Sequence, residues 1–169
     1  MAFPKSNEVF VTVGTTQFDQ LVSTIVDPCV LQVLKSRGYN GMTLQTGRGR
    51  PPVLVDAEAC SLQVQHYSLK ASLAEDITRA VLVVSHGGAG TCLEVLEAGK
   101  PLIIVVNHQL MGNHQLELAQ QLQAEGYAYC CSCDTLADTL RSFDPGALRP
   151  FPRGDPAAFA RSLDSMLGL

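Results

Sequence analysis

The stretch SHGGAGTCLEVLEAGKP occupies residues 85–101 and follows directly on the apolar run VLVV. The apolar run predicts a buried strand, and the apolar spacing after the glycines predicts a helix from about Gly88 to Ala98. Gly99 and Pro101 then end that helix. Because glycines at a strand-to-helix turn leave the backbone open, we expect another group to come close to it there.

The rest of the chain repeats this order of strand followed by helix. Short β-branched runs predict strands, and apolar residues three or four apart predict helices. The predicted strands are 8–14, 41–47, 62–67, 81–85, 101–106 and 127–131, and the predicted helices are 18–38, 68–80, 88–98, 113–126 and 155–169. Pro28 is expected to kink or restart the first helix. The alternation predicts an α/β fold, a Rossmann-like parallel sheet with helices on both faces.

Three glycine-containing turns follow predicted strands and therefore fall on one edge of this sheet. They are Gly14-Thr15-Thr16, Thr46-Gly47-Arg48-Gly49 and His86-Gly87-Gly88-Ala89-Gly90. Ligands of parallel α/β sheets bind at the carboxyl ends of the strands, beside the N-termini of the following helices. We therefore predict that this edge is the binding site.

The predicted helix start near Gly88 suits a phosphate, because its free N–H groups and its dipole attract negative charge. Thr91 adds a hydroxyl donor, and Glu94 lies one helical turn beyond Gly90. A carboxylate there could accept hydrogen bonds from both hydroxyls of a ribose, so the spacing fits a nucleoside diphosphate. Two alternatives stay open: His86 either faces the phosphates or is a core histidine bonded to backbone, and Glu94 could be an ordinary solvated helix residue.

The stretch departs from two common phosphate-binding motifs. Gly99-Lys100 is followed by proline and lies at the end of the helix, which is not the arrangement of a P-loop. The glycines also do not open the first strand–helix–strand unit, which disfavours a dinucleotide fold.

Composition restricts the class of partner. With 169 residues, 46% hydrophobic and 17% charged, the chain is expected to fold as one globular domain. The net charge of −4 argues against nucleic acid or an anionic membrane as the main partner, but not against a small anion held by backbone groups. With no apolar run of membrane-spanning length and no secretory signal, we expect a cytoplasmic chain whose cysteines are reduced.

Metal ligands at suitable spacing are lacking, so no metal or other cofactor is expected. The CCSC run at 130–133 has no second C-x-x-C pair, which makes buried or idle thiols the preferred interpretation over a metal site. His108 and His114 have no acidic or cysteine partner at ligand spacing.

The expected organisation has three parts. Residues 1–143 form the Rossmann-like domain, 144–154 a linker rich in proline, glycine and arginine, and 155–169 a C-terminal helix. Asp155 is a favoured N-cap, Pro156 suits the first helical position and Gly168 suits the stop. The apolar stripe of this helix packs either on its own domain or against another chain.

These motifs resemble the donor-nucleotide half of GT-B glycosyltransferases, the glycosyltransferase family 28 C-terminal domain. The resemblance rests on SHGGAGTCLEVLEAGKPLIIVVNHQLMGNHQLELA (85–119), VTVGTT (11–16) and LQTGRG (44–49), and it covers about residues 8–130. Within the family, the chain resembles the small soluble subunit of the eukaryotic UDP-N-acetylglucosamine transferase of dolichol-linked oligosaccharide synthesis. The resemblance implies that the fold is equivalent to the C-terminal half of a GT-B enzyme.

The resemblance also implies roles for the matching positions. Glu94 would hold the ribose hydroxyls, and His86 would be a phosphate contact or a catalytic acid. The other implied donor contacts are Gly87, Gly88, Ala89, Gly90 and Thr91 at the diphosphate; Gly14, Thr15, Thr16, Thr46 and Gly47 on the opposite wall; and Asn113, His114 and Gln115 at the sugar. Bacterial relatives carry a basic residue where this chain has Phe18-Asp19-Gln20, and Arg48 could take its place in neutralising the phosphates.

Only one half of a GT-B enzyme is present, so the resemblance implies a membrane-anchored partner subunit that binds the acceptor. That partner would recruit the chain to the cytosolic face of the endoplasmic reticulum. The implied reaction transfers GlcNAc from UDP-GlcNAc to GlcNAc-diphosphodolichol without a metal. Two alternatives remain: a non-catalytic nucleotide-sugar-binding or regulatory module that occupies the same partner, and a flavodoxin-like protein for another phosphate ligand.

Overall fold

The computed structural model describes residues 6–54, 62–107, 113–152 and 161, which form a wholly parallel six-stranded sheet. Neighbouring strands pair in the order β3-β2-β1-β4-β5-β6. The strands are β1 (Glu8–Thr12), β2 (Gly41–Gln45), β3 (Gln63–Tyr67), β4 (Leu82–His86), β5 (Leu102–Val106) and β6 (Tyr129–Ser132). The parallel α/β sheet predicted from the sequence is confirmed.

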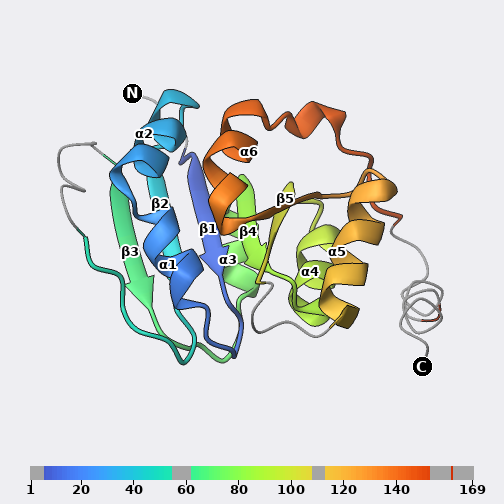
Figure 1. Cartoon of the computed structure of the whole chain (residues 1–169), viewed down its shortest axis with the longest axis horizontal. Coiled ribbons are helices and arrows are strands. Elements are labelled where there is room, and N and C mark those ends of the chain that lie inside the picture. The colour runs from blue at the N-terminus through green and yellow to red at the C-terminus, as the bar shows by residue number, and fades with distance from the viewer. Residues whose placement is uncertain (1–5, 55–61, 108–112, 153–160, 162–169) are drawn as a thin grey trace.

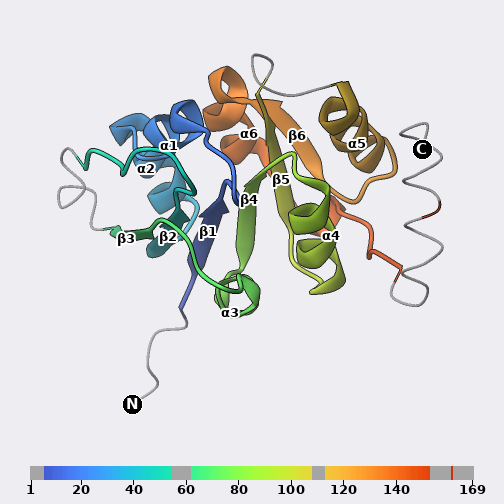
Figure 2. The same cartoon turned by 90° about the horizontal axis from the view of Figure 1, so that it is seen from below.

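Helices cover both faces of the sheet (Figure 1). They are α1 (Asp19–Ile25), α2 (Pro28–Ser36), α3 (Ala74–Arg79), α4 (Ala89–Glu97), α5 (Asn113–Ala124) and α6 (Leu136–Ser142), with the short 3-10 helices η1 (Cys133–Thr135) and η2 (Pro145–Ala147). Figure 2 shows α1, α2 and α6 on one side of the sheet and α3 and α4 on the other. Helix α5 packs with α4 in the second hydrophobic cluster.

The core is divided into two layers by the sheet. Alternate residues of β1 point to opposite faces, so that Val9 and Val11 join the cluster under α1, α2 and α6, while Phe10 joins the cluster under α3, α4 and α5. Strands β4 and β5 are buried along their whole length, because both of their faces are covered. This double burial is the reason that VLVV and LIIVV contain no polar alternation.

The first predicted helix is two helices, as the position of Pro28 allows. Helix α1 ends before Asp27, and Pro28 takes the first position of α2. The Asp27 carboxylate accepts a hydrogen bond from the Cys29 N–H at 2.9 Å and caps the second helix.

The prediction of a helix over 68–80 is wrong at its start, since α3 begins only at Ala74. The Ser68 carbonyl accepts hydrogen bonds from Gln45 Nε2 at 2.8 Å and from the Gly47 N–H at 3.0 Å, which fixes this segment as a loop. The Ser72 hydroxyl then accepts from the Ala74 N–H at 3.1 Å, where the helix begins.

Helix α6 was not predicted. Its apolar residues Leu136 and Leu140 are buried in the cluster under α1 and α2, together with Phe143. The Arg37 guanidinium at the end of α2 donates to the carbonyls of Arg141 and Phe143, which ties the two helices together.

The segment after α6 remains packed against the rest of the fold. The Arg149 N–H donates to the Gly126 carbonyl at 2.8 Å, and the Phe151 ring contacts the Tyr127 ring edge-to-face with centroids 5.3 Å apart. These contacts come from the middle of the segment 144–154. The predicted helix 155–169 lies outside the described residues except for Arg161, so the three-part division stays a prediction.

The cysteines of the CCSC run lie mostly in the core. Cys131 and Cys133 are buried in the first cluster, and burial raises the pKa of Cys131 to about 12. Among the described residues, no three His, Cys, Asp or Glu side chains gather as metal ligands. Over the same ranges, no helix is long and apolar enough to cross a membrane.

Candidate functional site

The three glycine-containing turns meet at the carboxyl edge of neighbouring strands, as predicted. Strands β2, β1 and β4 are adjacent, and each is followed by one of the turns. The connections run from β1 towards β3 on one side and from β4 towards β6 on the other, so their direction reverses between β1 and β4 (Figure 1). Such a reversal is the usual ligand position in open α/β sheets.

The turns after β1 and β2 are packed directly against each other. The Arg48 N–H donates to the Thr16 carbonyl at 2.9 Å, and Gly47 has a φ of 62°. A Cβ on Gly47 would overlap the Thr16 carbonyl oxygen. Glycine is therefore required here by the approach of the neighbouring loop as well as by backbone conformation.

The His86 ring lies between the turns after β1 and β4. A Cβ on Gly14 would lie 2.8 Å from His86 Cε1, and one on Gly88 would lie 2.5 Å from His86 Nε2. His86 is 6% exposed, and its Nδ1 has no hydrogen-bond partner within the described part of the chain. At Gly14 and Gly88, the group that comes close to the glycine backbone is therefore the His86 imidazole of the protein itself.

Burial lowers the pKa of His86, and a backbone contact with Thr12 offsets part of this effect. The folded protein thus favours the neutral ring, whereas the unfolded chain takes up a proton below a pKa of about 6.5. More protons are bound by the unfolded state on the acidic side, so stability must fall as the pH drops through this range.

We therefore expect the free energy of unfolding to decrease below pH about 6.5, by at most about 1.4 kcal/mol per pH unit from this group. Urea unfolding at several pH values between about 5.5 and 7.5 measures the slope, with His86→Asn as the comparison. An identical slope in the two proteins would show that His86 does not cause it.

The start of α4 presents backbone donors beside this ring. Gly88 is the N-cap residue, and no side chain among the described residues caps the helix. The first hydrogen bond of the helix runs from the Cys92 N–H to the Gly88 carbonyl at 3.0 Å, which leaves the N–H groups before Cys92 directed at the edge. A Cβ on Gly90 would meet nothing within 4 Å. Glu94 is exposed on the same helix, one turn further on.

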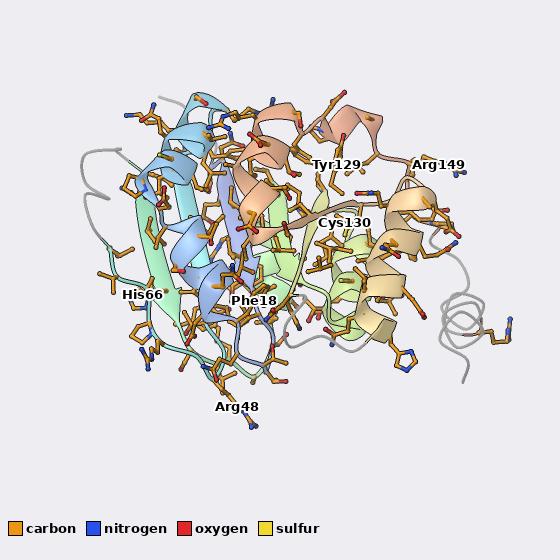
Figure 3. All side chains as sticks on the ribbon, viewed as in Figure 1. Phe18, Arg48, His66, Tyr129, Cys130 and Arg149 are labelled. Atoms are coloured by element: carbon orange, nitrogen blue, oxygen red, sulfur yellow. The ribbon has the colours of Figure 1, made fainter. Side chains whose placement is uncertain are left out.

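Several other predicted residues serve the geometry of the turns. The Thr16 hydroxyl donates to the Val13 carbonyl at 2.8 Å, and the Thr46 hydroxyl donates to the Tyr67 carbonyl at 3.2 Å. Thr15 is exposed. The Arg48 side chain extends from the loop tip away from the body of the fold (Figure 3).

The predicted sugar contacts are described only in part. Helix α5 begins at the same edge as α4, with His114 exposed and Gln115 half-buried in its first turn (Figure 1). The side chain of Asn113 lies outside the described residues.

After the first glycine turn, where the resemblance led us to look for a basic residue, this chain has an apolar anchor followed by an acid. Phe18 is buried in the core at the end of the first turn (Figure 3). The Asp19 carboxylate accepts hydrogen bonds from the Arg50 N–H and from Gln17 Nε2, both at 3.0 Å, and these bonds lower its pKa. Asp19 therefore fastens the second glycine loop to the start of α1.

Two cavities of the described part of the chain lie away from the glycine-rich edge. One cavity of about 480 Å³ lies between α1 and residues 50–53, and another of about 270 Å³ lies beside Lys100 and Arg149. Neither is lined by His86 or by a glycine of the three turns. One residue of the edge was also missed by sequence reasoning. It is Gln45, a polar residue in a buried strand, whose amide contacts the turn after β1 and the β3–α3 loop.

The family model described as glycosyltransferase family 28 C-terminal domain matches residues 8–166. This chain belongs to that family. The human UDP-N-acetylglucosamine transferase subunit ALG13 is 54% identical over 76% of this chain, and the mouse protein of the same name is 53% identical over 76%. This family 28 domain spans only 11% of the length of each of these relatives. The subunit of the same name from Eremothecium gossypii is 31% identical, with 98% of this chain and 95% of the relative covered.

Solved structures agree on the fold. An NMR solution structure of ALG13 superposes with a TM-score of 0.74 at 25% identity, and 98% of each chain is covered. Acinetobacter baumannii MurG superposes with a TM-score of 0.62 at 18% identity, with all of this chain matched to 51% of that one. The family 28 domain therefore has the fold of one half of a GT-B glycosyltransferase.

Proposed function

We propose that this chain is the donor-binding half of a transferase that moves GlcNAc from UDP-GlcNAc to GlcNAc-diphosphodolichol. The observation that carries the proposal is the meeting of three glycine turns at the β1/β4 reversal, beside the start of α4, which no side chain of the described residues caps. Backbone N–H groups and the helix dipole suit a diphosphate there. The names of the relatives supply the sugar nucleotide, since these proteins are UDP-N-acetylglucosamine transferase subunits.

In this proposal, the donor lies along the start of α4. Gly88 to Thr91 face the diphosphate, Glu94 accepts hydrogen bonds from the ribose hydroxyls, and His114 and Gln115 face the sugar. His86 is a contact of the β-phosphate side or an acid for the leaving group. Gly90, where a Cβ would meet nothing within 4 Å, leaves room for the close approach that a phosphate needs.

A partner subunit completes the site. The chain corresponds to about half of a GT-B enzyme in length, since it matches 51% of the MurG chain. A second surface is needed at the glycine-rich edge to hold the acceptor and exclude water. We propose that a membrane-anchored subunit supplies this surface and recruits the chain to the cytosolic face of the endoplasmic reticulum.

The reaction forms one bond and breaks one. The acceptor hydroxyl oxygen attacks the anomeric carbon of GlcNAc, the bond to the β-phosphate oxygen breaks, and UDP leaves with inversion at that carbon. The hydroxyl proton passes to a base of the partner half. The N–H groups at the start of α4 stabilise the charge that develops on the departing diphosphate.

The test uses membranes that retain the anchored partner but lack the small subunit. This chain, labelled UDP-GlcNAc and GlcNAc-diphosphodolichol are added, and label in the lipid product is followed. Restored transfer supports the proposal. No transfer, in a preparation that responds to an active subunit of the same kind, contradicts it; UDP-GlcNAc binding that persists without transfer then favours a non-catalytic module.

The Gly90→Ala variant tests whether UDP binding at this edge can be weakened without loss of folding. Because a Cβ there meets nothing within 4 Å, the variant should fold normally. Helix propensity should stabilise it by about 0.5–1 kcal/mol. UDP affinity should nevertheless fall by about tenfold, which corresponds to about 1.4 kcal/mol, because the methyl group takes space next to the diphosphate.

Calorimetric titration with UDP and urea unfolding of the same variant give the two readouts. Unchanged affinity in the stabilised protein would place the diphosphate away from Gly90.

A further inference from the structure

The Gln45 side chain lies at the end of β2 and contacts both the turn after β1 and the β3–α3 loop. It is 1% exposed. Its Oε1 accepts hydrogen bonds from the Thr12 hydroxyl at 2.5 Å, from the Val13 N–H at 3.2 Å and from the Gly14 N–H at 2.9 Å. Its Nε2 donates to the carbonyls of Gly14 at 2.6 Å and Ser68 at 2.8 Å.

The chemistry of these contacts requires an amide. One side of the group meets only donors and the other side meets only carbonyl oxygens, so oxygen and nitrogen each have matching partners. A carboxylate would satisfy the first side and repel the two carbonyls on the second. An apolar side chain would remove all five of these hydrogen bonds from a buried site, which is costly.

The contacts define the relative position of the loops. Gly14 is held through both its N–H and its carbonyl, and Ser68 is held by the same amide that holds Gly14. The turn after β2 joins them, because the Gly47 N–H also donates to the Ser68 carbonyl, at 3.0 Å. One buried side chain thus sets the spacing of the turns after β1 and β2 and of the β3–α3 loop.

We infer that Gln45 is a positioning residue for the sugar-nucleotide donor, an inference that rests on the proposed function. Gln45 does not touch the donor; it holds Gly14 and, through Ser68, Gly47 where the donor needs them. Loss of its amide should therefore weaken donor binding in molecules that remain folded.

The test compares wild type, Gln45→Glu and Thr43→Val. Gln45→Glu nearly keeps the shape and the acceptor side but loses both donated bonds. Thr43→Val is the matched control, because Thr43 is buried on the same strand two residues earlier and its hydroxyl has no partner among the described residues. UDP titration at a temperature where all three are folded should show about a tenfold weaker Kd for Gln45→Glu and less than about twofold change for Thr43→Val.

A kinetic split separates positioning from simple loss of stability. With the partner membranes, Gln45→Glu should raise the KM for UDP-GlcNAc and leave the KM for the lipid acceptor unchanged. A variant that only unfolds in part would lower the rate and leave both KM values unchanged.

Thr12→Val provides a second variant if Gln45→Glu does not fold. It removes one hydrogen bond accepted by Gln45 and one accepted from the Gly14 N–H by the Thr12 hydroxyl at 3.1 Å. Hydrogen exchange at Gly14 should become faster, and UDP affinity should fall about threefold.

The outcomes distinguish the positioning role of Gln45 from the proposed function. Wild-type UDP affinity in folded Gln45→Glu overturns the positioning role while the proposed function stands. Wild-type exchange at Gly14 together with unchanged affinity in Thr12→Val overturns it as well. A wild-type chain that does not bind UDP overturns the proposed function, and the positioning role with it.

Discussion

Replacing Glu94 with alanine should weaken UDP binding by about 10- to 100-fold, because hydrogen bonds to a charged group contribute about 1.5–3 kcal/mol. Glu94 is exposed on α4, one turn beyond Gly90. Removing an exposed helical side chain should change the free energy of unfolding by less than about 0.5 kcal/mol. The loss should therefore appear in binding and not in folding. Calorimetric titration with UDP and urea unfolding measure the two quantities.

The same helix offers the control. Glu97 is also exposed and lies three residues further on, so Glu97→Ala removes an equal charge from α4 without reaching the ribose. If both variants lose affinity equally, the effect comes from the general field of the helix. A loss confined to Glu94→Ala identifies a direct contact.

A second ligand tests which atoms Glu94 meets. UDP and 2′-deoxy-UDP differ by one ribose hydroxyl, so wild type should bind the deoxy compound more weakly. Glu94→Ala should bind both with similar affinity, since the acceptor for that hydroxyl is gone. If Glu94→Ala still binds 2′-deoxy-UDP more weakly than UDP, a group other than Glu94 contacts that ribose hydroxyl.

The strands and the site edge were predictable because their signals are local. VLVV and LIIVV identify buried strands of a parallel sheet, and each glycine turn follows directly on a strand. Once the strands are parallel, their carboxyl ends must lie on one edge, so the convergence of the turns needs no further information. Pro28 restarted a helix for an equally local reason.

The features that were missed depend on contacts between distant segments. Residues 68–73 have helical spacing, yet the Ser68 carbonyl is taken by Gln45 and Gly47 from another strand end. Helix α6 depends on burial of Leu136 and Leu140 against α1 and α2, although their spacing was visible. The His86 ring between Gly14 and Gly88 joins positions far apart in the sequence, so no local pattern reveals that these glycines accommodate it.

Gly47→Ala should lower the free energy of unfolding by about 2–4 kcal/mol, the largest stability effect that we expect at the edge. Two causes add. Gly47 has a φ of 62°, a left-handed conformation that costs an alanine about 1–2 kcal/mol. The new Cβ would also overlap the Thr16 carbonyl oxygen and lie 2.8 Å from Val13 Cγ2, so the first glycine turn must move.

Gly38→Ala measures the cost of the left-handed backbone conformation alone. Gly38 has a φ of 92°, but the nearest atom to its Cβ would be Asn7 Nδ2 at 3.7 Å, an ordinary contact. This variant should therefore lose only the conformational cost of about 1–2 kcal/mol and keep its UDP affinity. Urea unfolding of both variants measures the difference between them, which is the cost of separating the turns after β1 and β2.

That difference bears on function, since the two turns face the donor together in the proposed site. Folded Gly47→Ala should bind UDP more weakly, because relief of the overlap displaces the backbone at Thr16 or at Gly47 itself. Equal stability losses in Gly47→Ala and Gly38→Ala would mean that the turns are not in contact in solution. In that case the donor would have to bring them together on binding, and the edge would be assembled by its ligand instead of being formed before it arrives.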